Sequence, residues 1–186
     1  ARVEVDLGSL APGDVLVGEA LRVAIDDGRI TPALLPPGAL STLPETATLP
    51  SLRVLIAGGE ALPPAQMRRW ARGRAMFNAY GPTEITVYCT IHVCDQDADD
   101  VNVPIGKAIP GATVHVLDTD RRPAAMGELG ELYVGGAGLA RGYLHRPELT
   151  AERFIEDERS GERLYRTGDV ARRLPDGALE YHGRND

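Results

Sequence analysis

The chain has 186 residues, of which 43% are hydrophobic, and a formal net charge of −7. It is long enough for one large domain or two small ones with a buried core. The acidic balance argues against a nucleic-acid surface, which needs a basic patch to neutralise phosphates. No apolar run approaches the roughly 18 residues of a membrane helix, so we expect neither a nucleic-acid partner nor a membrane contact.

Cysteine and histidine usage excludes further classes. Cys89 and Cys94 are too few for a disulfide framework, and we interpret both as free thiols in a reducing compartment, the cytoplasm. The four histidines are scattered without a pair at metal-ligand spacing, so a zinc site is not expected. The first residues, ARVEVDLGSL, lack the charged-then-apolar pattern of a signal peptide.

The first 80 residues alternate between helical and strand patterns. In chain order these are a helix in GEALRVAIDDGR that ends at Gly28, a short buried strand in ITPALLPPG, a strand in LRVLIAGG, a helix in PPAQMRRWARG with prolines at its start, and a strand in AMFNAYG. Alternation of this kind is typical of a parallel sheet covered by helices. We therefore predict an α/β fold with parallel-sheet βα layers for this part.

Three loops follow the predicted strands of this sheet. They contain Pro37-Gly38, Gly58-Gly59-Glu60 and Asn78-Ala79-Tyr80-Gly81. Parallel strands end at the same edge of a sheet, where open α/β folds bind their ligands. We therefore expect these three loops to line one crevice.

From about Asp95 the pattern changes to short β-like runs separated by turns. The runs are TVHVLD, GELYVGG, ARGYL, RLYRTGDVARRL and ALEYHGR, and RPELTAERFIED interrupts them as a helix. We predict two parts, an α/β part over residues 1–94 and a β-rich subdomain that resembles a distorted barrel over residues 95–186.

The stretch NAYGPTEITVYCT, residues 78–90, places several polar groups directly before an apolar run. Tyr80 offers a flat face for stacking a planar ring, and Gly81 lets a ligand approach the backbone. Thr83 can donate to a phosphate oxygen, and Glu84 is a hard oxygen ligand suited to Mg²⁺ beside substrate phosphates. The alternation in ITVYCTIHV predicts a strand behind these groups. A strand-entry turn without any ligand explains the same residues equally well.

The C-terminal run YRTGDVARRLPDGALEYHGRND adds three candidates. Asp169 can accept hydrogen bonds from two adjacent hydroxyls, as on a ribose. Tyr181 supplies a second aromatic face, and Arg184 a cation for phosphate or ribose oxygens. Each has a plain structural alternative: a turn-capping carboxylate, a half-buried strand residue and a surface charge.

Five stretches together resemble the adenylation domains of nonribosomal peptide synthetases, in the AMP-forming acyl-adenylate superfamily. In family order they are NAYGPTE, PIGKAIPGATVHVLD, GELGELYVGGAGLARGYLHRPELTAERF, YRTGDVARRLPDG and EYHGRND, and the similarity runs from Leu34 onward. The resemblance implies an ATP-dependent amino acid ligase of antibiotic biosynthesis. It joins an amino acid to ATP to give aminoacyl-AMP and pyrophosphate, then transfers the acyl group to a carrier-protein phosphopantetheine thiol.

The resemblance also assigns partners and residues. The implied partners are an amino acid, a peptidyl carrier protein, the remaining parts of the adenylation domain and an MbtH-like protein. Glu84 is similar to the Mg²⁺ ligand, Thr83 to a phosphate contact and Asp186 to the hinge aspartate of the family. The residues similar to the family's ATP/AMP site are Gly59, Asn78, Ala79, Tyr80, Gly81, Asp169 as the ribose anchor, Tyr181 and Arg184.

Amino-acid selectivity in the family comes from positions that here are Gly38, Ile56, Gly58, Ala79, Val87 and Tyr88. Small residues leave volume between the walls, and none of the six can pair with a charged substrate. Because burying an unpaired charge costs several kcal/mol, we expect a bulky neutral side chain, aromatic slightly ahead of aliphatic.

Several family elements are not found in this sequence. They are the phosphate loop with its lysine, the aspartate for the substrate's α-amino group and the downstream catalytic lysine, whose role Lys107 is not expected to fill. We interpret the chain as the second half of the large core domain and expect it to be inactive by itself. The alternative is a non-catalytic scaffold that keeps the fold and only docks partners.

Overall fold

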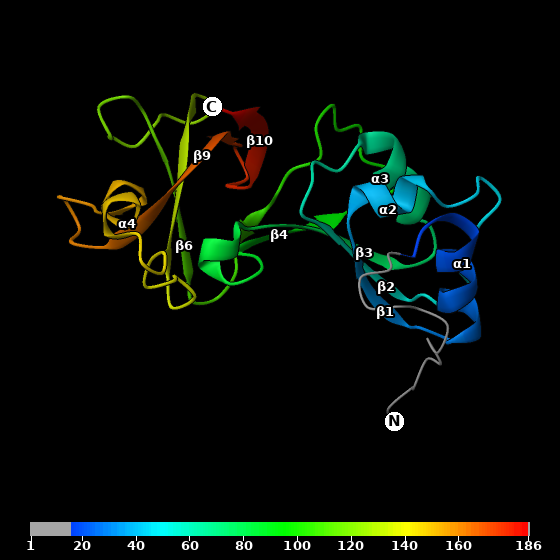
Figure 1. Cartoon of the computed structure of the whole chain (residues 1–186). Helices are drawn as coiled ribbons and strands as arrows, with labels where there is room; N and C mark the ends of the chain where they lie inside the picture. The colour runs from blue at the N-terminus through cyan, green and yellow to red at the C-terminus, as the bar shows by residue number, and fades with distance from the viewer. Residues whose placement is uncertain (1–15, 186) are drawn as a thin grey trace. The chain divides into compact units, whose positions relative to one another are not determined.

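The computed structural model describes residues 16–185 and separates into two compact units (Figure 1). The first, the α/β unit, runs to Phe77 and adds Val93–Val101. The second, the β-rich unit, consists of Asn78–His92 and the residues from Asn102 onward. The domain boundary that we expect after residue 94 stays a prediction. By its contacts, the segment Asn78–His92 belongs to the β-rich unit.

The α/β unit alternates helices and strands as predicted. Its elements are α1 (Gly18–Asp27), β1 (Pro32–Leu35), α2 (Pro37–Ser41), β2 (Val54–Gly58), α3 (Pro64–Trp70) and the start of β3 (Ala75–Tyr80). Strands β1 and β2 pair in parallel, from Pro32 opposite Val54 to Leu35 opposite Ala57. Figure 1 shows the three helices beside these strands, and the parallel pairing of β1 with β2 agrees with the predicted α/β arrangement.

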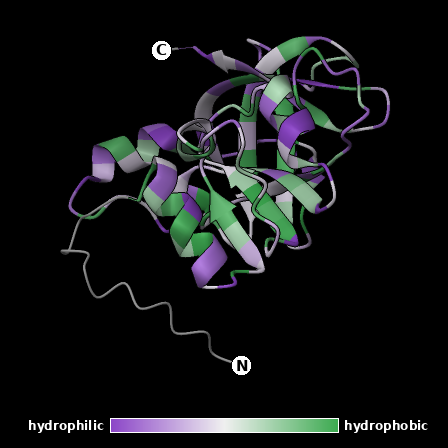
Figure 2. Ribbon diagram, turned by 90° about the vertical axis from the view of Figure 1, so that its right-hand side faces the viewer, coloured by the Kyte–Doolittle hydropathy of each residue, from purple (hydrophilic) through white to green (hydrophobic). Residues whose placement is uncertain are grey.

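Local sequence explains these helices. Pro37 and Pro64 stand at the starts of α2 and α3, where the missing N–H group is not needed for a helical hydrogen bond. Leu21 and Ile25 are buried one turn apart on α1, and Figure 2 shows the helices alternating between hydrophobic and hydrophilic residues. Within residues 16–185, no helix combines the length and apolar character needed to cross a membrane.

Two details of this unit differ from prediction. Strand β1 is not buried, because its residues alternate between exposed and half-buried, and Leu34 is 49% exposed. Pro37-Gly38, expected in a loop, opens the short helix α2. Pro36 is extended, with φ −68° and ψ 146°, and Pro37 begins the helix, so a single residue separates β1 from α2.

The β-rich unit follows with mostly antiparallel strands. Its elements are the 3₁₀ turn η1 (Thr83–Ile85), β4 (Thr90–Cys94), β5 (Lys107–Ala108), β6 (Ala112–Leu117), β7 (Leu129–Gly136), α4 (Pro147–Arg153), β8 (Phe154–Glu156), β9 (Arg163–Arg173) and β10 (Leu179–Arg184). One sheet has the strand order β10-β9-β7-β6, with β8 also paired to β9. The other has the order β1-β2-β3-β4-β5, in which β5 pairs antiparallel with β4.

Two predicted elements of this unit are wrong in part. The run ARGYL, residues 140–144, forms no strand. The helix predicted through RPELTAERFIED ends at Arg153, because Phe154–Glu156 pair with β9 as β8. In both places a contact between distant segments decides the conformation, and the local pattern does not contain it.

The predicted strand over residues 85–93 is also wrong in its first half, since β4 begins only at Thr90. Thr86 and Val87 have φ angles of 69° and 78°, a left-handed conformation that no strand contains. The chain therefore bends after η1. Val87 is 66% exposed, although the alternation placed it on the same face as Ile85.

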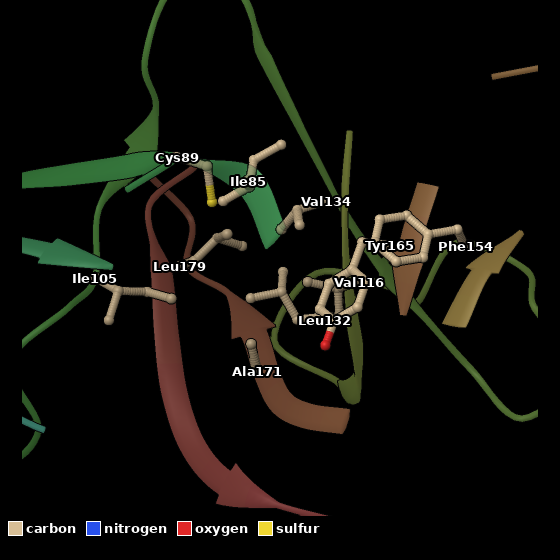
Figure 3. Packing of buried hydrophobic residues seen from close by; sticks show 10 residues of the cluster. All are labelled: Ile85, Cys89, Ile105, Val116, Leu132, Val134, Phe154, Tyr165, Ala171 and Leu179. Carbon is tan, nitrogen blue, oxygen red and sulfur yellow. The ribbon is translucent and has the colours of Figure 1, made fainter. Parts of the chain in front are cut away.

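The core of the β-rich unit joins this bend to the sheet. Figure 3 shows Ile85 and Cys89 beside core residues from β6, β7, β9 and β10. Burial raises the pKa of the Cys89 thiol to about 12, and both cysteines are buried and form no disulfide, as predicted. The two core side chains on either side of the bend fix the segment that follows β3.

Candidate functional site

The segment after β3 forms a tight turn. The Ile85 N–H donates to the Pro82 carbonyl at 3.1 Å, and the Thr86 N–H donates to the Thr83 carbonyl at 3.1 Å. The Cys89 N–H donates to the Tyr80 carbonyl at 2.8 Å and closes the loop at the end of the strand. The turn leaves Thr83 exposed and Glu84 half-buried.

Gly81 is required here for space. A Cβ atom at this position would lie 2.4 Å from the Tyr88 Cα and 2.8 Å from the Cys89 nitrogen. Both neighbours are backbone atoms, which cannot move aside as a flexible side chain can. The close approach of residues 81 and 88 therefore depends on the missing side chain.

We expect Gly81→Ala to destabilise the full-length domain by about 2 kcal/mol or more, because the added methyl group overlaps backbone. Urea unfolding of the variant and the parent measures the difference. Gly38→Ala is the matched control, since its Cβ would meet only the end of the Glu60 side chain at 3.0 Å. Equal stability of the two variants would contradict the close approach at Gly81.

Asn78 and Ala79 precede this turn on β3 and are both buried. The Asn78 side-chain amide donates to the Pro104 carbonyl at 2.9 Å. This hydrogen bond joins β3 to the segment before β5. The Asn78 amide is therefore engaged in a structural contact.

Tyr80, Asp169 and Arg184 form a cluster within the β-rich unit. The Tyr80 hydroxyl donates to Asp169 Oδ2, and Arg184 Nη1 lies 3.2 Å from Asp169 Oδ1. Asp169 is 6% exposed, and its N–H donates to Thr167 Oγ1 at 2.9 Å. Arg184 is opposite Asp169 in the pairing of β9 with β10, so the sheet register brings the two charges together.

Two aromatic rings belong to the same cluster. The Tyr80 and Tyr181 ring centroids are 6.3 Å apart with an interplanar angle of 35°. Burial, together with the Asp169 charge, raises the pKa of Tyr80, so its hydroxyl remains a donor. A flat ring beside a buried carboxylate matches what a nucleoside requires, a stacking surface for the base and an acceptor for the ribose hydroxyls.

Glu84 lies in a second polar cluster. Its Oε1 atom accepts hydrogen bonds from the Tyr143 hydroxyl at 2.5 Å and the Tyr165 hydroxyl at 2.9 Å. Burial raises the pKa of both phenols. The next cause is a hydrogen bond, to Glu84 for Tyr143 and to Tyr143 for Tyr165. Sequence reasoning missed these tyrosines, which lie 59 and 81 positions from Glu84.

The residues around Glu84 fit a magnesium ion carried in with phosphates. Among the described residues, no group of three His, Cys, Asp or Glu side chains could hold a metal. Mg²⁺ usually binds one or two carboxylates and takes its other ligands from water and substrate phosphates. Glu84 Oε2 accepts no hydrogen bond from residues 16–185, so it can serve as such a ligand.

The α/β unit holds the other predicted residues. Gly58 is buried at the end of β2, Ile56 is half-buried and Gly59 is exposed with a φ of +87°. The Gly38 N–H donates to Glu60 Oε2 at 2.8 Å, which joins the start of α2 to the loop after β2. Two of the three segments expected at one sheet edge therefore meet.

The remaining predicted residues divide between the β-rich unit and the chain end. Val87 is exposed and Tyr88 is half-buried after the left-handed bend. Asp186, the predicted hinge residue, lies outside the described residues.

The family of the chain follows from its sequence. Residues 10–144 match the family described as AMP-binding enzyme. The chain belongs to this family. The cluster of Tyr80, Asp169 and Arg184 therefore lies in a chain of the AMP-binding enzyme family.

Curated relatives of this chain include antibiotic-synthesis proteins. Novobiocin biosynthesis protein H from Streptomyces niveus is 51% identical over 180 residues, which are 95% of this chain and 30% of that protein. Bacitracin synthase 3 from Bacillus licheniformis is 46% identical over 174 residues, 93% of this chain and 3% of that protein. The chain thus spans 30% or less of these two relatives.

Solved structures of similar fold also come from nonribosomal peptide synthetases. PA1221, a nonribosomal peptide synthetase protein containing adenylation and PCP domains, superposes with a TM-score of 0.84 at 37% identity, over 98% of this chain and 37% of that one. FmoA3 in an alpha-methyl-L-serine-AMP bound form gives 0.82 at 34% identity, over 90% of this chain and 20% of that one. The predicted resemblance to an adenylation domain of a nonribosomal peptide synthetase, and the predicted mixed α/β fold, are confirmed.

Proposed function

We propose that this AMP-binding enzyme supplies the nucleotide site, and part of the amino-acid site, of a domain that activates an amino acid. An oxygen of the amino acid's carboxylate attacks the α-phosphorus of ATP, and the bond to the β-phosphate oxygen breaks. The products are aminoacyl-AMP and pyrophosphate. A carrier-protein phosphopantetheine thiolate then attacks the acyl carbon, AMP leaves, and a thioester forms.

The observation that carries this proposal is the Tyr80–Asp169–Arg184 cluster. Tyr80 and Tyr181 provide aromatic surface for adenine, and the buried Asp169 carboxylate provides two oxygens for the ribose diol. Arg184 lies next to Asp169 as a cation for ribose or phosphate oxygens. A cluster of this composition supports the binding of ATP and AMP.

Residues of η1 extend the proposed site to the phosphates. Glu84 would hold Mg²⁺ through its second oxygen, and the exposed Thr83 hydroxyl would donate to a phosphate oxygen. When bound, Mg²⁺ supplies charge neutralisation to the phosphate oxygens during displacement. Gly59 adds backbone that a ligand can approach closely, since a Cβ atom there would meet nothing within 4 Å, whereas the space beside Gly81 is occupied by the Tyr88 backbone.

The amino-acid part of the proposal rests on the six positions to which the family resemblance assigns selectivity. None of them has a charged side chain: Gly38, Ile56, Gly58, Ala79, Val87 and Tyr88. We expect a bulky neutral substrate, aromatic slightly ahead of aliphatic. The PCP domain of PA1221 supports a carrier protein as the partner, and an MbtH-like partner rests on the family resemblance alone.

Amino-acid-dependent ATP–pyrophosphate exchange by the full-length domain tests the proposal. In a panel of amino acids, bulky neutral ones are expected to give the highest kcat/KM. Asp, Glu, Lys and Arg are expected to lie about a hundredfold or more below them, because an unpaired buried charge costs several kcal/mol. A preference for a charged substrate would contradict the selectivity assignment. Absence of exchange with every amino acid would favour the non-catalytic scaffold.

A further inference from the structure

We propose that Tyr143 and Tyr165 are positioning residues for Glu84. Their hydroxyl groups donate to one carboxylate oxygen, Oε1, and thereby leave the other, Oε2, in a fixed position from which it would hold a magnesium ion. The inference rests on the proposed function, in which Glu84 is a metal ligand. It gives a role to two side chains to which the family resemblance assigns none.

The geometry around Oε1 is that of an oriented carboxylate. The Tyr143 hydroxyl donates to Oε1 at 2.5 Å and the Tyr165 hydroxyl donates at 2.9 Å, while the two hydroxyls are 3.2 Å apart. Two donors on one oxygen fix the rotation of the carboxylate plane. They leave the lone pairs of the other oxygen without a protein donor among the described residues.

Both tyrosine rings are fixed by their neighbours. Phe154 packs edge-on against Tyr143, with ring centroids 5.5 Å apart, and lies tilted by 52° against Tyr165, with centroids 5.1 Å apart. Figure 3 shows the Phe154 and Tyr165 rings side by side in the core. The Tyr143 N–H donates to Thr150 Oγ1 at 2.9 Å, which joins the loop to α4. Hydroxyl groups on rings held in this way have little freedom to leave Glu84.

The same loop also contacts the backbone of η1. The Ala140 N–H donates to the Glu84 carbonyl at 2.7 Å, and the Thr86 hydroxyl donates to the Gly138 carbonyl at 2.7 Å. Arg163 in turn donates to the Ala140 carbonyl at 2.7 Å. Residues 138–143 therefore determine both where the Glu84 backbone lies and how its side chain is turned.

This arrangement matters because Mg²⁺ requires near-octahedral ligand geometry. A freely rotating carboxylate would bind through either oxygen and would lose conformational entropy each time it binds the ion. Partners that orient a metal ligand without touching the metal typically change metal affinity by about 10–100-fold when they are removed. Loss of the hydroxyls should therefore weaken magnesium binding and leave the nucleoside contacts of Tyr80 and Asp169 unchanged.

The test uses the full-length domain with Tyr143→Phe, Tyr165→Phe and the double variant. Each change removes one hydroxyl and keeps the ring. Tyr133→Phe is the matched control, because Tyr133 is also a buried tyrosine that donates to a glutamate, Glu131 Oε2, at 3.3 Å. Pyrophosphate exchange is measured against free Mg²⁺ at saturating ATP and amino acid. Calorimetry measures binding of a non-hydrolysable ATP analogue with and without Mg²⁺.

We expect the half-saturating Mg²⁺ concentration to rise about 10–100-fold in the double variant, with kcat at saturating Mg²⁺ within a few-fold of the parent. The analogue should bind more weakly only when Mg²⁺ is present. Tyr133→Phe should match the parent in both measurements. Single variants guard against misfolding of the double variant, since the less buried Tyr143 tolerates the change most easily.

Two results would overturn the inference. One is an unchanged magnesium dependence in every Phe variant. The other is an equal loss of activity at all magnesium concentrations, which marks a purely structural contact. If the parent domain shows no exchange with any amino acid, the proposed function fails, and the calorimetric comparison still decides whether the tyrosines position a metal ligand.

Discussion

Glu84→Gln in the full-length domain is expected to lower amino-acid-dependent pyrophosphate exchange by about a hundredfold or more. The proposed Mg²⁺ ion stabilises phosphate charge by several kcal/mol, and the change from carboxylate to amide removes the negative charge that holds it. Gln keeps an oxygen that can accept from the Tyr143 and Tyr165 hydroxyls. Ala would instead leave both hydroxyls without this acceptor, so Gln separates chemistry from folding.

The control for this variant is Glu131→Gln. Glu131 also accepts a tyrosine hydroxyl, from Tyr133, and it pairs with Arg166 at 2.9 Å, so it contacts none of Tyr80, Asp169 and Arg184 through the bonds of its side chain. Both variants lose one negative charge beside a tyrosine. Exchange and thermal unfolding are measured for the two side by side. Near-parental exchange in Glu84→Gln would remove Glu84 from the proposed metal site.

Asp169→Asn is the second change with a large expected effect. We expect kcat/KM for ATP to fall by about a hundredfold, since each hydrogen bond to a charged group contributes roughly 1.5–3 kcal/mol and the proposed ribose contact has two. The amide also turns one acceptor into a donor that faces Tyr80 or Arg184. The parent should prefer ATP over 2′-deoxy-ATP, and the variant should lose most of that preference.

Asp176→Asn serves as the control for Asp169→Asn. Asp176 lies in the exposed turn before β10, where its Oδ1 accepts from the Ala178 N–H at 3.0 Å, and Asn can keep that bond. It should retain both the parental kcat/KM and the preference for ATP. If Asp169→Asn discriminates between ATP and 2′-deoxy-ATP as well as the parent does, the ribose assignment is wrong.

Local chemistry made much of the α/β unit predictable. Prolines at the starts of α2 and α3 and buried residues one turn apart on α1 act within a few positions of the chain. The strand expected over residues 85–93 failed for a different reason. Ile85 and Cys89 do enter the core, but the left-handed Thr86 and Val87 between them make a bend, and an alternating pattern does not distinguish a bend from a pleat.

The candidate site also contains residues that the sequence predicts and residues that it does not. Tyr80, Asp169 and Arg184 each carried a chemical reason to bind a nucleotide, and the structure brings them into contact. Tyr143 and Tyr165 carried none, because the residues on either side of them in the sequence do not indicate a partner for their hydroxyl groups. Their connection to Glu84 exists only once η1, the loop before α4 and β9 have been brought together.

The division of β3 between the two units bears on how such domains can be recombined. Tyr80 with Asp169, and Glu84 with Tyr143 and Tyr165, make their contacts entirely within the β-rich unit. A chimera that imports residues 34–60 from a relative would therefore exchange Gly38, Ile56 and Gly58 without cutting any of these hydrogen bonds. A crossover between Tyr80 and Asp169 would instead mix the two halves of one polar cluster from different parents, so breakpoints upstream of Phe77 are the ones that keep it intact.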